Sequence, residues 1–484
     1  MSKLIFERSS PGRRAFNLPG LSEAEKSCRL HIPGKYFREQ PAELPELSEM
    51  EVVRHFVGLS RRNFSVDGQM YPLGSCTMKY NPKICERVAA LDGFSSLHPL
   101  LPQLRGGGML TQGALEVLYE TEQMLCEIAG MDAFSLQPSA GAHGELTGMM
   151  LVAAYHRDKG NRKTRVIIPD SAHGTNPSSA AIAGYSVTTV PTGPDGDIDL
   201  GKYEAALGSD VAAVMLTCPN TLGLFERDIS RIAAMAHKHD ALLYYDGANL
   251  NALLGRCRPG DLGFDVVHIN LHKTFATPHG GGGPGSGPVG VKKHLVPFLP
   301  TSIVVKRADG TFALEYDRAK SIGYIAPFYG NFAVILRAYA YMLLLGGNGM
   351  REVSENAVLN ANYILAKLKG RYDLPYARQC MHECVFSATR QLAKGVHALD
   401  VAKALIDRGI HPPTIYFPLV VKEALMIEPT ETESREQMDE FISAMLEIAD
   451  LAERDPKAFA DMPRTTPVSR LDETKAARNM KFSA

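Results

Sequence analysis

The chain has 484 residues, enough for about three folding units or for one large domain with appendages. Its 52 Lys and Arg residues nearly balance its 53 Asp and Glu residues without a long block of like charge, so the composition excludes the usual signature of a nucleic-acid binder or a membrane-surface protein. Hydrophobic residues at 45% and charged residues at 22% exclude a disordered, collagen-like or coiled-coil architecture.

The N-terminus and the cysteines favour a cytoplasmic protein. The first residues lack the apolar core and the cleavage site of a secretory signal, and a transit peptide is the alternative for this Arg- and Ser-containing start. The 8 cysteines are scattered without a C-x-x-C pair, which argues against a disulfide scaffold or a zinc ribbon. No apolar run approaches the ~20 residues that span a bilayer, so we expect no transmembrane segment.

The first two regions of the chain differ in their patterns. Residues 1–65 are interrupted by prolines and predict an N-terminal arm with one amphipathic helix within 48–62. Residues 66–335 alternate helical stretches, expected at 115–129 and 145–157, with short apolar runs such as RVIIPD, VAAVML, ALLYYD and DVVHIN. This alternation is typical of a buried, mostly parallel sheet covered by helices, and it predicts a large α/β domain.

The third region, residues 336–484, predicts a smaller C-terminal α+β domain with a polar tail. Helical stretches over 331–345 and 356–370 lead into it, and Gly370 is a suitable C-terminal cap for the second. Short strand-like and helical pieces follow, including a helix whose capping box begins at Ser434.

A lysine and an aspartate each lie at the end of an apolar strand. Lys273 comes directly after the run 265–270, and Asp246 ends the run that begins at Ala241. Ligands bind at the C-terminal edge of a parallel sheet, where a partly desolvated lysine can form a Schiff base with an aldehyde. A nearby carboxylate can keep the pyridine nitrogen of pyridoxal phosphate protonated. Taken alone, Lys273 also fits a solvated surface lysine, and Asp246 also fits a loop residue or a helix cap. The two residues together predict a cofactor site.

A turn of small residues leads into the helix expected from Glu145. The backbone amides of this turn and the positive end of the helix predict an anion cradle suited to a phosphate. His143, at the mouth of the helix, is a candidate for stacking on a cofactor ring, although a single histidine is more often only packed or exposed. The residues that form the cradle are Ser139, Ala140, Gly141 and Ala142.

A glycine-rich loop over 280–290 follows Lys273 and permits close approach of its backbone to a ligand or to a neighbouring subunit. The loop contains a formal G-x-G-x-x-G pattern, but Pro288 interrupts it and no strand–turn–helix context surrounds it. A Rossmann dinucleotide site is therefore excluded.

Five segments, taken together, resemble the glycine cleavage system P-protein family. They are 71–81 (YPLGSCTMKYN), 137–145 (QPSAGAHGE), 173–177 (HGTNP), 246–249 (DGAN) and 271–275 (LHKTF). With the stretch MIEPTE near the C-terminus, the likeness covers nearly the whole chain from about residue 40.

The resemblance implies an aspartate-aminotransferase-like α/β fold, the fold type I of pyridoxal-phosphate enzymes. It implies glycine dehydrogenase activity: oxidative decarboxylation of glycine with release of CO2 and transfer of the aminomethyl group to the lipoyl arm of H-protein. Fused family members are much longer, so the chain is similar to subunit 2 of the split bacterial form, in which two copies pair with two copies of subunit 1. Lys273 identifies it with the cofactor-bearing half.

The resemblance also implies roles for individual residues. Lys273 carries pyridoxal phosphate, Asp246 maintains the charge of its ring, and His143 stacks on that ring. His272 assists at the phosphate or the substrate, and His173 lines the glycine site. No metal is required, because the lysine-bound cofactor supplies the chemistry.

Two alternative functions remain open. One is a different pyridoxal-phosphate decarboxylase or a transaminase on the same fold, and the other is a non-catalytic assembly subunit. Among the cysteines, we interpret Cys76 as a small packed thiol rather than a relay to the lipoyl group. A metal site from Cys380, His382 and Cys384 is disfavoured, because the three side chains of a predicted strand would lie on one face too far apart to converge.

Overall fold

The computed structural model describes residues 3–17, 19–20, 22–27, 33–40, 42–104, 107–280, 283 and 285–480. The chain forms two compact units, Met1–Ser65 and Val66–Ala484. In the first unit the expected helix is α2, and its start is a capping box in which Ser48 and Glu51 exchange hydrogen bonds between side chain and backbone. The elements of this unit are η1 (Phe6–Arg8), α1 (Glu23–Ser27), η3 (Gly34–Tyr36) and α2 (Glu49–Ser60).

A seven-stranded sheet organises the second unit, with the strand order β1-β7-β6-β5-β4-β2-β3. Strands β3, β2, β4, β5 and β6 are parallel neighbours, whereas β7 runs antiparallel to both β6 and β1. The strands are β1 (Ala133–Ser135), β2 (Arg165–Pro169), β3 (Ser186–Val190), β4 (Val211–Leu216), β5 (Leu242–Gly247), β6 (Val266–Ile269) and β7 (Val289–Val291). The prediction of a mostly parallel sheet is confirmed.

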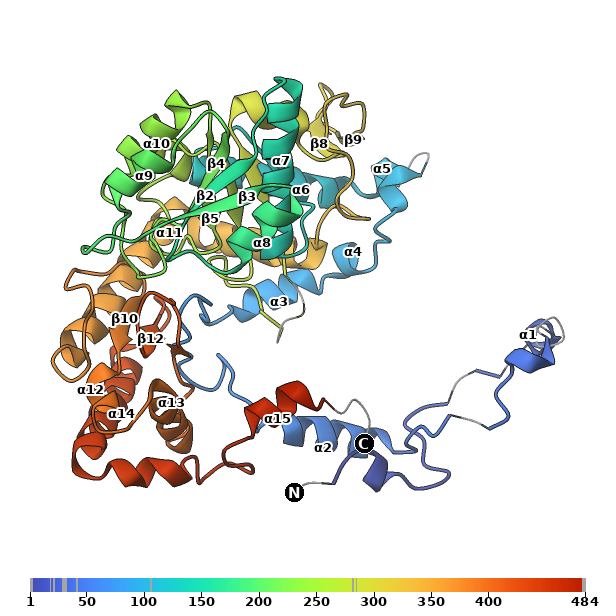
Figure 1. The fold of residues 1–484 in the computed structure, drawn as a ribbon. Helices are drawn as coiled ribbons and strands as arrows, with labels where there is room; N and C mark the ends of the chain where they lie inside the picture. The colour runs from blue at the N-terminus through green and yellow to red at the C-terminus, as the bar shows by residue number, and fades with distance from the viewer. Residues whose placement is uncertain are drawn as a thin grey trace. The chain divides into compact units, whose positions relative to one another are not determined.

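Apolar side chains cover both faces of this sheet. Along β5, Leu243 and Tyr245 join one hydrophobic cluster with α6, α10 and the start of α11, whereas Leu242 and Tyr244 join another with α7 and α8. Figure 1 shows α7 and α8 lying across one face of the sheet. The helices of this region are α3 (Lys83–Ala89), α4 (Asp92–Ser95), η4 (Leu101–Gln103), α5 (Gly107–Leu110), α6 (Gln112–Ala129), α7 (Gly141–Asp158), α8 (Thr175–Ile182), α9 (Leu200–Ala206), α10 (Ile229–Lys238), η5 (Pro259–Leu262) and η6 (Lys293–Phe298), followed by the hairpin β8 (Ile303–Lys306) and β9 (Phe312–Glu315).

The two helical stretches expected around residue 346 are both present in the long helix α11 (Phe332–Leu368), which is broken at Gly346, where the backbone is non-helical with φ 60° and ψ −176°. By length and composition, α11 is the one helix among the described residues that could cross a membrane. Its first half buries Val334 and Ile335 in the cluster beneath the sheet, and its second half buries Ala361 and Ile364 in a separate cluster. Within this fold α11 contributes buried side chains to two separate cores, whereas Leu343, Leu344 and Leu359 are exposed.

The C-terminal part has its own core around an antiparallel sheet with the order β10-β12-β11. Helix α14 begins at Ser434 with the expected capping box, and Gly370 follows α11 with a positive φ of 93°. The elements are β10 (Cys384–Ser387), α12 (Thr389–Leu392), α13 (Ala398–Asp407), β11 (Thr414–Ile415), β12 (Ala424–Ile427), α14 (Arg435–Arg454), η7 (Pro456–Asp461) and α15 (Glu473–Arg478). A domain boundary at residue 335 remains a proposal.

Candidate active site

Lys273 and Asp246 line the same cavity, which has a volume of about 140 Å³. Asp246 is the penultimate residue of β5 and pairs with His268 of the neighbouring strand β6. Lys273 comes four residues after the end of β6. Because β5 and β6 are parallel neighbours, their C-terminal ends bring the carboxylate and the amine to one edge of the sheet.

The carboxylate of Asp246 is buried but has three polar neighbours. His268 Nε2 lies 3.4 Å from Oδ1, Asn176 Nδ2 donates to Oδ2 at 2.9 Å, and the Ala248 N–H donates to Oδ1 at 3.1 Å. Burial raises the pKa of Asp246, but His268, these hydrogen bonds and the charge of Lys273 together lower it below its ordinary value. Asp246 is therefore ionised at neutral pH.

Glu145 is a second carboxyl group on the cavity wall, in the second turn of α7. Its Oε2 accepts a hydrogen bond from the hydroxyl of Thr175 at 2.9 Å, and its buried Oε1 has no hydrogen-bond partner in the structure. Burial and the nearby Asp246 raise the pKa of Glu145 to about 7. The cavity thus combines an ionised carboxylate with a carboxyl group that is partly protonated at neutral pH.

The small-residue turn packs tightly against the edge of the sheet. A Cβ atom at Gly141 would lie 2.4 Å from the side-chain Oδ1 of Asn270, and one at Gly144 would lie 2.3 Å from the backbone carbonyl oxygen of Gly287, so Gly144 in particular requires glycine. Helix α7 begins at Gly141, four residues before the expected start, and no side chain caps it. Its first N–H groups are consequently open to an anionic ligand.

The glycine-rich loop contributes to this contact through its later residues. A Cβ atom at Gly287 would lie 2.1 Å from the carbonyl oxygen of Ala140, so the loop backbone passes directly beside the start of α7. Positions 281, 282 and 284 of the predicted loop lie outside the described residues.

The cavity wall includes only some of the predicted site residues. Ala142 and Gly141 line it, whereas Ser139, Ala140, His143 and His272 are not among the described residues that do. The Nδ1 atom of His143 accepts a hydrogen bond from the N–H of Ser139 at 3.3 Å, which places its ring within the turn.

Two other predicted histidines differ in their access to the cavity. His173 lines it, with Nδ1 2.9 Å from the Thr175 hydroxyl, and burial and the charge of Lys273 lower its pKa against the opposite effect of Asp246. His272 is not among the described residues that line the cavity, and its Nδ1 accepts a hydrogen bond from the N–H of Ser286 at 3.3 Å. Burial, His279 and Lys273 lower the pKa of His272 to about 4, so its ring is neutral.

The amine of Lys273 donates to the carbonyl oxygen of Ser75 at 2.8 Å. The N–H of Ser75 donates in turn to Oε2 of Glu383, also at 2.8 Å, and Ser75 and Glu383 both line the cavity. Burial and the neighbouring Glu428 raise the pKa of Glu383 to about 8, so it is largely protonated at neutral pH. Sequence reasoning missed Ser75, Glu383 and His268; the motifs that contain Ser75 and Glu428 were noted only for their family likeness.

The cysteines near the C-terminal sheet correct one expectation. The thiols of Cys380 and Cys384 contact each other as hydrogen-bonding partners, and both are buried. Of the three residues in the predicted strand, only Cys384 lies in one, because β10 begins at Cys384 and Cys380 and His382 precede it. His382 is directed instead to the carboxyl groups of Glu383 and Glu428. Burial raises the pKa of Cys76, which is consistent with a packed thiol.

Solved structures show the same fold. A glycine decarboxylase (P-protein) of the glycine cleavage system, in inhibitor-bound form, aligns with a TM-score of 0.73 and 23% identity over 90% of this chain and 100% of its own. Glutamate decarboxylase from Lactobacillus brevis aligns with a TM-score of 0.66 and 14% identity over 89% and 98% of the two chains. The prediction of fold type I of the pyridoxal-phosphate enzymes is confirmed.

Relatives match the chain over almost its whole length. A probable glycine dehydrogenase (decarboxylating) subunit 2 from Pelodictyon phaeoclathratiforme is 57% identical and covers 99% of this chain and 98% of its own. One from Listeria monocytogenes serotype 4b is 55% identical and covers 98% and 96%. The family model "Glycine cleavage system P-protein" matches residues 12–317, and the model "Glycine dehydrogenase, C-terminal domain" matches residues 353–462. The chain therefore belongs to the glycine cleavage system P-protein family.

Proposed function

We propose that this chain is the catalytic subunit 2 of a split glycine dehydrogenase (aminomethyl-transferring) and that it binds pyridoxal phosphate at Lys273. The supporting observation is that the Lys273 amine and the ionised Asp246 carboxylate line one cavity beside the uncapped start of α7. Polar atoms without protein partners, Glu145 Oε1 and Thr217 Oγ1, belong to residues of the same wall. These residues fit a polar cofactor that carries an aldehyde, a basic ring nitrogen and a phosphate.

When bound, pyridoxal phosphate supplies a protonated ring that accepts the electron pair of a bond broken at the substrate's α-carbon. Lys273 provides the amine that attaches the aldehyde, and Asp246 holds a proton at the ring nitrogen. The start of α7, at Gly141 and Ala142, would provide N–H groups for the phosphate, and Ser139 and Ala140 shape the turn that precedes them.

The histidines divide between the cavity and its support. His173 lines the cavity together with His268 and His382, and we assign it to the glycine site. His143 is held in the turn by the N–H of Ser139, which donates to its Nδ1 in the plane of the imidazole and so does not occupy the ring face that stacking on the cofactor would use. His272 accepts a hydrogen bond from the Ser286 N–H of the glycine-rich loop, and we assign it to the support of that loop at the phosphate side of the site.

The cavity suits the release of CO2. Among the described residues that line it, none is an arginine, so no guanidinium binds the carboxylate of glycine tightly in the ground state. The bond between the α-carbon and the carboxylate breaks, and a bond forms between that carbon and one sulfur of the lipoyl disulfide. The disulfide accepts the electron pair and its second sulfur takes a proton, so the carbon is oxidised while the lipoyl group is reduced.

We further propose that the chain assembles with subunit 1, two copies of each, and that it acts in the cytoplasm on lipoylated H-protein. The names of the relatives support a partner subunit, since they are called subunit 2. Co-expression with subunit 1 and measurement of the mass of the purified complex test this assembly.

The exchange of labelled bicarbonate into the carboxyl group of glycine tests the activity. The complex is expected to catalyse this exchange only with lipoylated H-protein, and Lys273→Ala is expected to abolish it while Lys293→Ala, a replacement of an exposed lysine, retains it. Exchange without H-protein would favour a different decarboxylase, and full exchange by the Lys273→Ala complex would favour an assembly role.

A further inference from the structure

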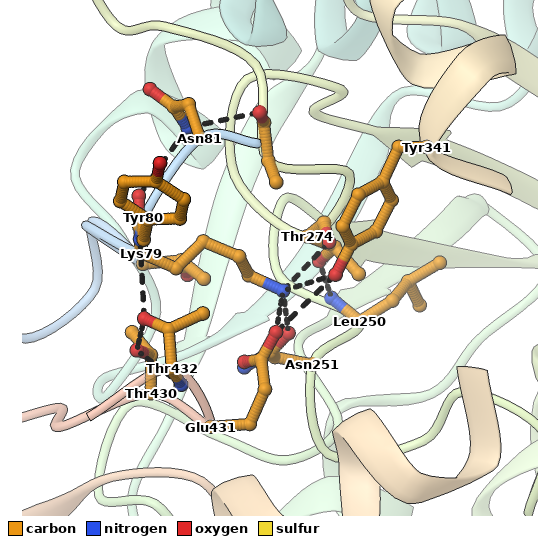
Figure 2. A network of polar contacts seen from close by, with 12 residues as sticks. Lys79, Tyr80, Asn81, Leu250, Asn251, Thr274, Tyr341, Thr430, Glu431 and Thr432 are labelled. Carbon is orange, nitrogen blue, oxygen red and sulfur yellow. Dashed lines mark hydrogen bonds and ion pairs between the residues drawn. The ribbon is translucent and has the colours of Figure 1, made fainter. Parts of the chain in front are cut away.

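Lys79 is a buried lysine that lies outside the cavity. Its side chain has no exposed surface, and its Nζ atom contacts four groups from distant parts of the chain. It donates to Asn251 Oδ1 at 2.7 Å, to Glu431 Oε1 at 2.7 Å and to the carbonyl oxygen of Thr274 at 2.8 Å, and Tyr341 Oη lies at 3.4 Å. Figure 2 shows these contacts converging on the Nζ atom. The three N–H donors of the ammonium group are thereby satisfied.

The partners of Lys79 connect segments that sequence separates widely. Asn251 follows β5 and Thr274 follows Lys273, whereas Tyr341 lies in α11 and Glu431 follows β12. A buried ammonium is stable only when it is paired and hydrogen-bonded. The segments must therefore be in place together, and the position of each depends on the others.

A second set of contacts holds the same loop beside Lys79. The N–H of Thr77 donates to Glu428 Oε2 at 3.0 Å, and Asn249 Nδ2 donates to Glu428 Oε1 at 2.8 Å and to the Thr77 hydroxyl. Thr77 has a positive φ of 51°, which a β-branched residue adopts only when its surroundings impose it. Two carboxylates three residues apart, Glu428 and Glu431, thus fix residues 77 and 79.

Together the two sets of contacts constrain the backbone that follows Lys273 and the loop that accepts a hydrogen bond from its amine. Lys79 holds the carbonyl group of Thr274, the residue that follows Lys273, and Asn81 Nδ2 donates to the carbonyl oxygen of Ala276 at 2.9 Å. The same loop supplies the Ser75 carbonyl that accepts the Lys273 amine. Lys79 therefore fixes the backbone of Lys273 and, through the loop, the acceptor that orients its amine.

We propose that Lys79, paired with Glu431, is a positioning residue that sets the place and direction of the Lys273 amine at the cavity. The proposal rests on the proposed function, because it gives Lys79 a purpose in cofactor attachment. Its positional part, order imposed on the backbone around Lys273, is measurable without cofactor.

Three variants separate positioning from folding. Lys79→Met leaves Glu431 buried without its cation and is expected to lower the melting temperature of the apoprotein. Adding Glu431→Gln removes the unpaired charge and keeps the side-chain length, so stability is expected to recover in large part. Arg337→Met is the matched control, because it breaks an ion pair with Glu86 from the same helix as Tyr341 and touches neither Lys273 nor its loop.

The first readout is hydrogen exchange of the peptide 270–276 in the full chain, co-purified with its partner subunit and free of cofactor. We expect about tenfold faster exchange in Lys79→Met and in the double variant, and wild-type exchange in Arg337→Met. Wild-type exchange in the double variant overturns the proposal, because Lys79 would then serve folding alone.

The second readout is the visible absorption band of added pyridoxal phosphate, titrated with pH. A displaced amine is expected to shift the midpoint by about half a pH unit or more in both Lys79 variants, and Arg337→Met is expected to keep the wild-type midpoint. A wild-type midpoint in the stable double variant also overturns the proposal. Absence of the band in the wild-type protein contradicts the proposed function instead, and the exchange experiment still decides the position of the backbone.

Discussion

The imidazole Nε2 of His268 lies 3.4 Å from the carboxylate Oδ1 of Asp246, and the hydroxyl of Tyr244 lies 2.7 Å from the other ring nitrogen. All three side chains are buried, and they belong to the neighbouring strands β5 and β6. The pair is held by strand register, since Asp246 and His268 are direct neighbours across the two strands. Of the groups that favour the ionised form of Asp246, His268 has the largest effect, and its position is fixed by the register of the two strands.

Replacing Asp246 with Asn tests that charge. An amide keeps the shape but cannot hold the ring nitrogen protonated, so kcat/KM for glycine is expected to fall about a hundredfold or more, with weaker binding of pyridoxal phosphate. Steady-state kinetics of the complex measure the change. The control is Asp240→Asn, which affects an exposed pair with Lys159 and is expected to retain activity. Activity of Asp246→Asn within about threefold of wild type would contradict the assigned role.

Glu383 predicts a pH dependence of stability. In the folded protein its pKa is raised from 4.5 to about 8, so the folded state retains a proton that the unfolded chain has lost. The contribution of this bound proton to the free energy of unfolding is fully present below pH 4.5 and is lost as the pH rises through 8. Glu383→Gln cannot lose a proton. The free energy of unfolding of the variant, relative to that of the wild type, is therefore expected to increase from pH 5 to 8, by at most about 1.4 kcal/mol per pH unit.

Urea denaturation of the apoprotein at several pH values measures this difference. A difference between Glu383→Gln and wild type that stays constant from pH 5 to 8 would mean that Glu383 is ionised throughout, and the description of a protonated carboxyl group on the cavity wall would be wrong.

The contact between Gly144 and the glycine-rich loop predicts a steric effect. A methyl group at this position meets the carbonyl oxygen of Gly287, so Gly144→Ala is expected to cost about 1–3 kcal/mol of unfolding free energy and to weaken phosphate binding. Gly347→Ala in α11 meets nothing within 4 Å and is expected to be neutral or slightly stabilising. Thermal unfolding of both variants measures the contrast; equal effects would show that α7 and the loop are not in close contact.

The sequence predicted the parts of the fold and site that depend on nearby residues. Alternating apolar runs and helices indicated the parallel sheet, and parallel neighbours place Asp246 and Lys273 at one edge. Gly130 ends α6 in the left-handed conformation, as a glycine after an apolar helix indicates. Such features need only local periodicity and capping chemistry.

The rest of the site depends on contacts between distant segments. Ser75 and Glu383 are 308 positions apart, and no local pattern indicates that they are bonded. The start of α7 was predicted too late, because glycine has low helix propensity, whereas at Gly141 and Gly144 the close approach of Asn270 and Gly287 decides the residue type.

Attachment of the cofactor at Lys273 is the central claim, and one measurement tests it most directly. The chain, purified with its partner subunit and supplied with pyridoxal phosphate, is reduced with borohydride, and the labelled peptide is mapped by mass spectrometry. We predict a visible Schiff-base band that borohydride removes, with the reduced cofactor on Lys273 and none on the buried Lys79. No band, or a label on another lysine, would contradict the account.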